Sequence, residues 1–194
     1  MGHDYDAADQ AAYRTWQTEQ AQLRLDRLHT KRPAAFNKPG RLHPDITAWC
    51  DRYAAGQPGN LVLVGGVGVG KTWSLWAAAE YLITTHHWRG RFEVARAYDF
   101  QRAVAPPLDE QQIRRWATAD LLALDDLGAQ RVSEWDAGHL AGIINERSEH
   151  ETPFIVTSND GDLAPILGER SASRTRENTT VVVMTGTDRR ELRS

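Results

Sequence analysis

One motif limits the possible folds of this chain more than any other feature: Gly65-Gly66-Val67-Gly68-Val69-Gly70-Lys71-Thr72. It follows an apolar run at 61–64 and opens a segment, 72–84, with helical patterning. A strand, a glycine-rich turn of this spacing and a helix form a phosphate-binding loop. The glycines let successive backbone N–H groups point at one phosphate, and the helix N-terminus adds a favourable dipole. The motif therefore predicts that Lys71 reaches the terminal phosphates of ATP and that Thr72 ligates Mg2+.

Apolar runs bounded by turn or charged residues predict four more strands, at 92–95, 121–124, 154–157 and 180–183. Continuous apolar runs of this length are typical of strands buried on both faces. The segments between them have helical patterns, at 98–104, 109–117, 134–150 and about 163–176. Strands that alternate with helices form a parallel sheet with right-handed crossovers. We therefore expect an α/β fold with a parallel five-stranded sheet flanked by helices.

An acidic pair, Asp125 and Asp126, directly follows the predicted strand at 121–124. A phosphate loop needs such a strand, because an acid at its end completes the metal site. Asp125 is predicted to hold Mg2+ through water, and Asp126 to orient or deprotonate the attacking water. The alternative is that both acids only cap a strand at a turn.

The N-terminal region differs from the rest of the chain. Residues 4–29 lack Gly and Pro and are rich in helix formers, but their apolar stripe is irregular. Such a helix needs a partner, which is either the body of this chain or another protein. Six Lys or Arg and one acid lie between Arg24 and Arg41, together with prolines, which predicts a basic linker that ends the helix. A short helix is expected at 44–53.

Composition excludes several classes of protein. A net charge of -3 argues against coating nucleic acid by charge alone, so a DNA contact requires a local basic patch. No apolar stretch approaches the roughly 20 residues of a membrane helix, and the N-terminus lacks a secretion-signal layout. The one cysteine, Cys50, excludes an internal disulfide. We therefore expect a cytoplasmic protein with no membrane partner.

Four motifs in order resemble the AAA+ ATPases of the DnaC/IstB type, which are bacterial and phage helicase loaders and transposition helpers. They are the phosphate loop, Leu-Leu-Ala-Leu-Asp-Asp-Leu-Gly, Ile-Ile-Asn-Glu-Arg-Ser ahead of Pro-Phe-Ile-Val-Thr-Ser-Asn, and Leu-Gly-Glu-Arg-Ser-Ala-Ser-Arg. The resemblance runs from about 35 to 190. It implies an AAA+ core at 35–194, preceded at 1–34 by a helical extension and linker that dock a partner.

The resemblance also implies roles for residues outside the phosphate loop. Asn159 is similar to the sensor-1 residue, which hydrogen-bonds the attacking water or the γ-phosphate. Arg174 resembles the arginine finger, which reaches the ATP of a neighbouring subunit in a self-assembled array, and Arg170 resembles its accompanying arginine. Arg147, in the Asn-Glu-Arg-Ser segment, is a candidate for a further subunit contact.

In assemblies of this kind single-stranded DNA passes through the centre of a spiral, and the loop after the acidic pair faces inward. That loop holds a cation, a hydroxyl and an aromatic ring, which are Arg131, Ser133 and Trp135. Trp135 would stack on a base, or would pack in the core under the following helix. Trp73 and Trp76 are expected to pack against the sheet or the next subunit.

Two features depart from the common AAA+ pattern. The acidic pair ends in Asp126 where Glu is usual, which predicts slow intrinsic hydrolysis. The stretch after Val183 is too short for a helical lid, so the resemblance implies a reduced or absent C-terminal lid.

The function that the resemblance implies is ATP-dependent loading of a replicative helicase during DNA replication, by a small protein of phage type that binds single-stranded DNA. An IstB-like transposition helper and a nucleotide-dependent scaffold with little hydrolysis remain alternatives. A small-molecule kinase also uses a phosphate loop, but we would expect it to lack Asn159 and Arg174.

Overall fold

The computed structural model describes residues 7–57, 59–128, 133–176 and 178–186. One parallel sheet has the strand order β2-β3-β4-β1-β5, which confirms the expected five-stranded α/β fold. Its strands are β1 (Asn60–Val64), β2 (Phe92–Arg96), β3 (Leu121–Leu127), β4 (Phe154–Ser158) and β5 (Thr179–Val183). Because the strands are parallel, the carboxyl ends of β1, β3 and β4 lie at the same edge of the sheet. The connection from β1 leaves this edge at the point where the strand order reverses.

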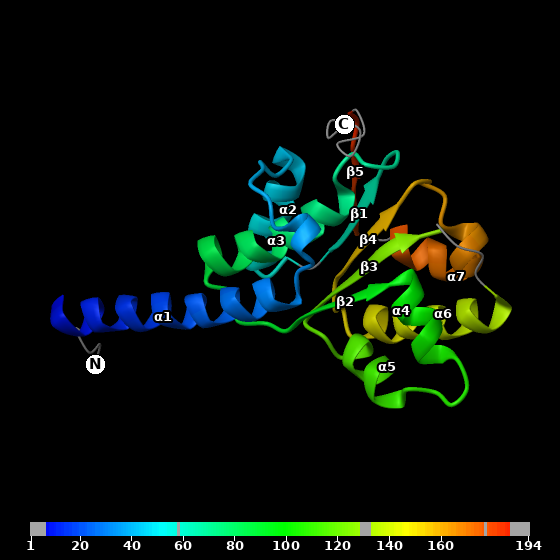
Figure 1. The fold of residues 1–194 in the computed structure, drawn as a ribbon, viewed down its shortest axis with the longest axis horizontal. Helices are drawn as coiled ribbons and strands as arrows, with labels where there is room; N and C mark the ends of the chain where they lie inside the picture. Colours follow the sequence, from blue (N-terminus) through cyan, green and yellow to red (C-terminus); the bar gives the residue numbers. More distant parts are fainter. Residues whose placement is uncertain (1–6, 58, 129–132, 177, 187–194) are drawn as a thin grey trace.

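Helices cover both faces of the sheet (Figure 1). One face carries α2 and α3 with the inner end of α1, and α4 to α7 lie on the other. The helices are α1 (Ala7–Lys31), α2 (Pro44–Ala54), α3 (Lys71–His86), α4 (Ala97–Val104), α5 (Glu110–Ala117), α6 (Glu134–Glu149) and α7 (Ala164–Arg176), with a 3-10 turn, η1, at Ala34–Phe36.

The alternation of side chains along each strand divides the core into two layers. Leu61 and Leu63 of β1 pack in the layer under α2 and α3, whereas Val62 between them packs in the layer under α6 and α7. Both sets are almost wholly buried, as continuous apolar strands require. This double burial fixes the register of β1, and thereby the place at which the phosphate loop begins.

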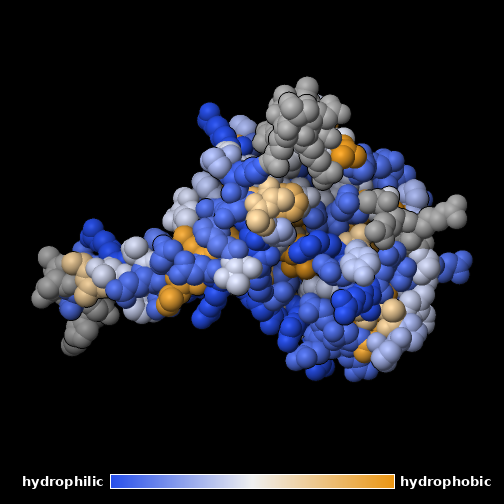
Figure 2. Space-filling model, in the orientation of Figure 1, coloured by the Kyte–Doolittle hydropathy of each residue, from blue (hydrophilic) through white to orange (hydrophobic). Residues whose placement is uncertain are grey.

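Helix α1 extends from the body (Figure 1). Its inner end packs on α3, where Ala21 and Leu28 are buried and Arg32 donates to Glu80 Oε2 at 2.7 Å. The helix continues to Lys31, two residues beyond the predicted end at His29, so the first basic residues of the stretch 24–41 belong to the helix. The outer half carries few buried residues, and Figure 2 shows a largely hydrophilic surface there. No helix in the described ranges is long and apolar enough to cross a membrane.

Arg147 is a structural residue and not a surface contact. Its side chain is wholly buried in α6 and donates to the carbonyls of Trp116, Ala117, Ala119 and Pro153 at 2.5–3.1 Å. The guanidinium thereby satisfies carbonyls at the end of α5, which a helix C-terminus leaves without partners. Burial lowers its pKa to about 10. The expectation of a subunit contact at Arg147 was therefore wrong.

Candidate nucleotide-binding site

The phosphate loop connects the carboxyl end of β1 to the first turn of α3. Gly70 is the N-cap of α3 and adopts a left-handed conformation (φ 104°), which favours glycine. Gly65 lies against the segment that directly follows β5, because a Cβ there would be 2.3 Å from the carbonyl oxygen of Met184. The chain therefore turns sharply after β1 and presents the N-terminus of a 16-residue helix, α3, which favours an anion.

The ammonium group of Lys71 lies within the loop. Its Nζ donates to the carbonyl oxygens of Gly65 at 2.6 Å and Gly66 at 2.7 Å, and to Asn159 Oδ1 at 2.8 Å. Asn159 directly follows β4, so the tight contact joins the phosphate loop to a second strand end. The structure thus brings together the predicted phosphate-binding lysine and the predicted sensor residue.

The buried carboxylate of Asp125 forms a second cluster on β3, beside the loop. Only 4% of this residue is exposed, and its Oδ1 accepts bonds from the hydroxyls of Thr72 at 2.9 Å and Thr157 at 2.7 Å. Burial raises the pKa of the Asp125 carboxyl, although both hydroxyl bonds act in the opposite direction. Within the described residues no cation lies within ion-pair distance of this carboxylate. A buried carboxylate beside a threonine hydroxyl is a suitable ligand set for Mg2+, which prefers a few oxygen ligands and phosphate.

Asp126 points away from its neighbour because the strand is irregular at this residue. The pairing between β3 and β4 shifts register between Leu124 and Leu127, and Asp126 has φ 65°. Asp125 is consequently buried while Asp126 is exposed. Thr157 Oγ1 accepts the backbone N–H of Asp126 at 2.8 Å, so one hydroxyl group bonds to both acids of the pair.

Thr157 is a residue that the sequence reasoning missed, and its role can be tested. Valine has the shape of threonine but lacks the hydroxyl, so Thr157→Val removes the hydrogen bonds to both acids. The backbone N–H of Asp126 then loses its partner, and the carboxylate of Asp125 is held by one hydroxyl instead of two. We expect Thr157→Val to weaken Mg2+-dependent nucleotide binding about 10-fold and to change binding in EDTA much less. Titration calorimetry with a non-hydrolysable ATP analogue measures both. Thr157→Ser should retain the wild-type behaviour, and a valine variant with unchanged Mg2+ dependence would contradict this role.

A pocket of about 130 Å³ lies on the other side of the loop. Arg41 and His43, from the segment before α2, line it together with Trp73 of α3 and Met184 after β5. The indole N–H of Trp73 donates to the carbonyl of Lys38 at 2.9 Å, which ties that segment to α3. The sequence reasoning missed this pocket, because three distant segments form it. Trp76, by contrast, is buried edge-on to Phe92, as expected for packing against the sheet.

The two predicted arginines lie far from this cluster. Arg174, near the end of α7, lines a second pocket of about 220 Å³ with Asn60 and Phe154, which are the first residues of β1 and β4. It donates to Asn145 Oδ1 at 2.8 Å, and Arg170 is exposed on the same helix. This pocket is at the amino edge of the sheet, whereas the phosphate loop is at the carboxyl edge. Arg174 is therefore remote from the phosphate loop of its own chain.

The predicted DNA contacts divide into three cases. Arg131 lies outside the described residues. Ser133 is the N-cap of α6, where its hydroxyl accepts the N–H of Asp136 at 3.1 Å. Trp135 is 54% exposed and its indole N–H donates to Val104 O at 2.8 Å, so the alternative of core packing for Trp135 was wrong.

The order of the parallel strands, the loop after β1, the acids of β3 and the asparagine after β4 define the AAA+ class of P-loop ATPases. The family described as IstB-like ATP binding protein matches residues 53–163, more than half of the chain. The chain therefore belongs to that family, and it is an AAA+ ATPase of the DnaC/IstB type. None of the curated protein sequences matches it.

Solved structures support the fold. The DnaC helicase loader aligns with a TM-score of 0.64 and 22% identity, over 77% of this chain and 96% of that one. DnaI aligns with a TM-score of 0.63 and 22% identity, over 82% and 88%. AMPPCP-bound DnaA from Aquifex aeolicus aligns with a TM-score of 0.59 and 22% identity, over 74% of this chain and 47% of that one. These TM-scores show a shared fold.

Proposed function

We propose that this protein hydrolyses ATP and uses it to load a replicative helicase on DNA, as the DnaC-type resemblance implies. One observation carries the proposal: Lys71, Thr72, Asp125 and Asn159 converge from α3, β3 and the end of β4 through bonds of 2.8–2.9 Å. These groups supply a cation for phosphate, ligands for Mg2+ and an amide for the γ-phosphate. The family match and the AMPPCP-bound structural relative support binding of an adenine nucleotide.

The proposed nucleotide lies along the loop with its phosphates at the N-terminus of α3. Backbone N–H groups of 65–72 bind the phosphates, and Lys71 neutralises the terminal ones. The pocket beside Trp73 then receives the base and ribose, with Arg41 and His43 as polar neighbours. Mg2+, held by Thr72 and Asp125, would neutralise charge on the β- and γ-phosphate oxygens.

Hydrolysis needs a group that orients water beside the γ-phosphate. Asp126 is exposed at the carboxyl edge of the sheet, next to the buried Asp125, and is the proposed general base. Asn159 contacts Lys71 and is the proposed sensor of the same phosphate. Arg174 of a neighbouring subunit, accompanied by Arg170, would complete the site with a guanidinium, so turnover should depend on self-assembly.

Partner binding is proposed for the region 1–34, in which α1 extends from the ATPase body (Figure 1). A replicative helicase is the proposed partner, and the likeness to a DnaC helicase loader supports that choice. Single-stranded DNA is proposed to contact the region of Arg131, Ser133 and Trp135, where the half-exposed indole offers a stacking surface. A transposition helper, with a transposase as partner, remains a second candidate because the matching family is IstB-like.

Replacing Asp126 with asparagine tests the enzymatic part of the proposal. We expect Asp126→Asn to bind ATP within about two-fold of wild type, because the side chain of Asp126 is exposed and the Thr72 hydroxyl bonds to Asp125 instead. Steady-state turnover with single-stranded DNA should fall by about 100-fold or more, since general base catalysis contributes roughly 10²–10⁴. Equal turnover in both proteins would favour the scaffold, and co-purification with a helicase or a transposase separates the two partner classes.

A further inference from the structure

One side of α1 combines aromatic and basic side chains. Tyr13, Trp16, Arg24 and Arg27 recur at intervals that are multiples of three or four residues, so they lie along one flank of the helix. Arg89, from the connection between α3 and β2, approaches the same flank, with its guanidinium 4.9 Å from the ring centre of Trp16. We call these five residues the basic flank. From Tyr13 to Arg27 it spans about 21 Å at the usual helical rise.

The aromatic part of the basic flank is open to solvent. The rings of Tyr13 and Trp16 are stacked with their centres 5.9 Å apart, and the residues are 55% and 43% exposed. A stacked, half-exposed ring pair that a guanidinium also contacts is a suitable platform for a nucleobase, because every base offers a π face.

The basic part holds like charges close together. Burial lowers the pKa of Arg24, and the charges of Arg89 and Arg27 lower it further. Arg24 and Arg27 are three residues apart on α1, so they are neighbours on its surface. Within the described parts of the chain none of these three has a carboxylate within ion-pair distance. A polyanion would relieve the mutual repulsion.

Three acids near the inner end of α1 have partners outside the flank. Asp26 of α1 accepts a hydrogen bond from Gln22 Nε2 at 2.9 Å. Glu80 pairs with Arg32 at 2.7 Å, and Glu93 pairs with Lys31 at 3.1 Å. The uncompensated charge is therefore local, although the whole chain has a net charge of -3. A local basic patch on an acidic protein attracts a polyanion to one surface.

We propose that the basic flank binds single-stranded nucleic acid, with Arg24, Arg27 and Arg89 on successive phosphates and with Tyr13 or Trp16 stacked on a base. Tyr, Trp and Arg are also enriched at protein interfaces, but the three guanidinium groups have no carboxylate partner among the described residues, which favours a polyanion on this flank. The inference rests on the proposed function and deepens it. It adds a second contact with single-stranded nucleic acid, separate from the one proposed at Arg131 and from the nucleotide site.

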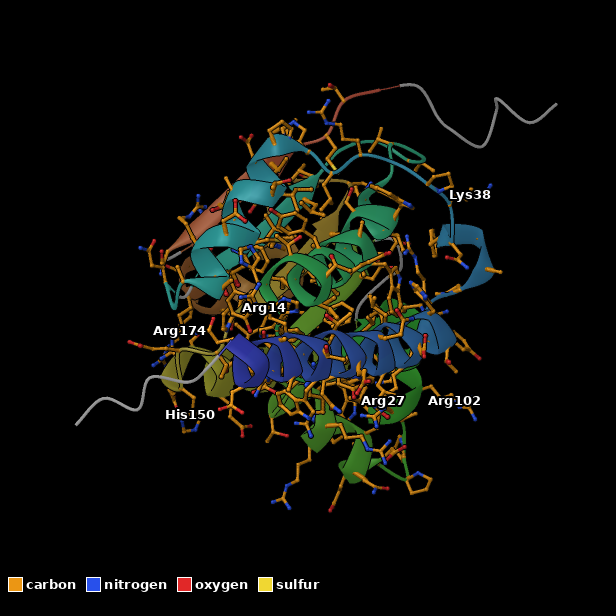
Figure 3. The ribbon with its side chains drawn as sticks, turned by 90° about the vertical axis from the view of Figure 1, so that its left-hand side faces the viewer. Arg14, Arg27, Lys38, Arg102, His150 and Arg174 are labelled. Atoms are coloured by element: carbon orange, nitrogen blue, oxygen red, sulfur yellow. The ribbon has the colours of Figure 1, made fainter. Side chains whose placement is uncertain are left out.

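Charge reversal tests the proposal in the full-length protein. Binding of a fluorescein-labelled oligo-dT is measured by anisotropy at several salt concentrations for wild type, Arg24→Glu/Arg27→Glu and a control. The control, Arg14→Glu/Arg115→Glu, changes the net charge equally but alters exposed arginines elsewhere. Figure 3 shows Arg14 and Arg27 on different sides of α1. Circular dichroism verifies that both variants keep their helices, and ATP-analogue binding verifies the nucleotide site.

We expect Arg24→Glu/Arg27→Glu to weaken oligo-dT binding at least 10-fold and to lower the slope of log K against log salt by about 1.4, as for two lost phosphate contacts. Tyr13→Ala should weaken binding by several-fold with the slope unchanged. Equal losses in flank and control variants would overturn the inference. Unchanged oligo-dT binding with loss of helicase binding would overturn it in favour of a protein partner. If the wild type bound no oligo-dT, the inference and the DNA part of the proposed function would both fail, while ATP binding would stand.

Discussion

Lys71→Ala is expected to lower the affinity for ATP by at least about 100-fold. The ammonium group is the cation at the centre of the phosphate loop, and removing a buried charged partner costs roughly 2–5 kcal/mol, with a tenfold change for every 1.4 kcal/mol. Titration calorimetry with a non-hydrolysable analogue in Mg2+ measures the loss.

A matched control for this variant is available in the same protein. Lys38→Ala removes a lysine of the segment before α2 whose backbone carbonyl, and not its ammonium group, contacts Trp73. It should bind the analogue within about two-fold of wild type. Unchanged affinity in Lys71→Ala, in a protein with a wild-type melting temperature, would refute the assignment of the phosphate loop.

Arg174→Ala is expected to lower ATP turnover by about 1,000-fold in the assembled state while leaving nucleotide affinity of a single subunit unchanged. An arginine finger contributes roughly 10³–10⁵ to the rate, and Arg174 lies at the sheet edge opposite its own phosphate loop. Turnover is measured with single-stranded DNA present. Arg176→Ala, on the same helix turn, is the control and should remain active, since Arg176 donates to the Ala172 carbonyl.

Mixing subunits determines whether the arginine acts between chains. A Lys71→Ala subunit keeps its finger but binds no ATP, and an Arg174→Ala subunit binds ATP but has no finger. Partial recovery of turnover in the mixture is expected, because some interfaces then combine an intact loop with an intact finger. A mixture as inactive as its components would contradict action across a subunit boundary.

The elements of the sheet were predictable because their signals are local. Each predicted strand is within three residues of the observed bounds, and the phosphate loop begins α3 as expected. The largest difference is at β3, which continues through Leu127, because a register shift keeps the chain paired with β4 beyond the acids. That register shift turns Asp126 outward, and the sequence pattern of 121–128 does not predict the shift.

Other features depended on contacts between distant segments. Thr157 bonds to both acids only because β3 and β4 are neighbours in a particular register. The pocket beside Trp73 exists because the segment at Lys38 crosses α3. The basic flank likewise needs Arg89, which is 62 residues from Arg27 in the sequence. A sequence pattern describes one segment at a time, so it does not predict contacts between segments that are far apart in the chain.

The sequence by itself determined the strand and helix alternation, the phosphate loop and the identity of the acidic pair, because periodicity and glycine spacing act over short distances. Only the tertiary structure decided how deeply the arginines are buried. Arg147 and Arg174 both lie in motif segments, yet Arg147 is wholly buried against four carbonyls and Arg174 remains partly exposed at the amino edge. Burial depends on which elements pack together, and that is a property of the folded chain and not of any one segment.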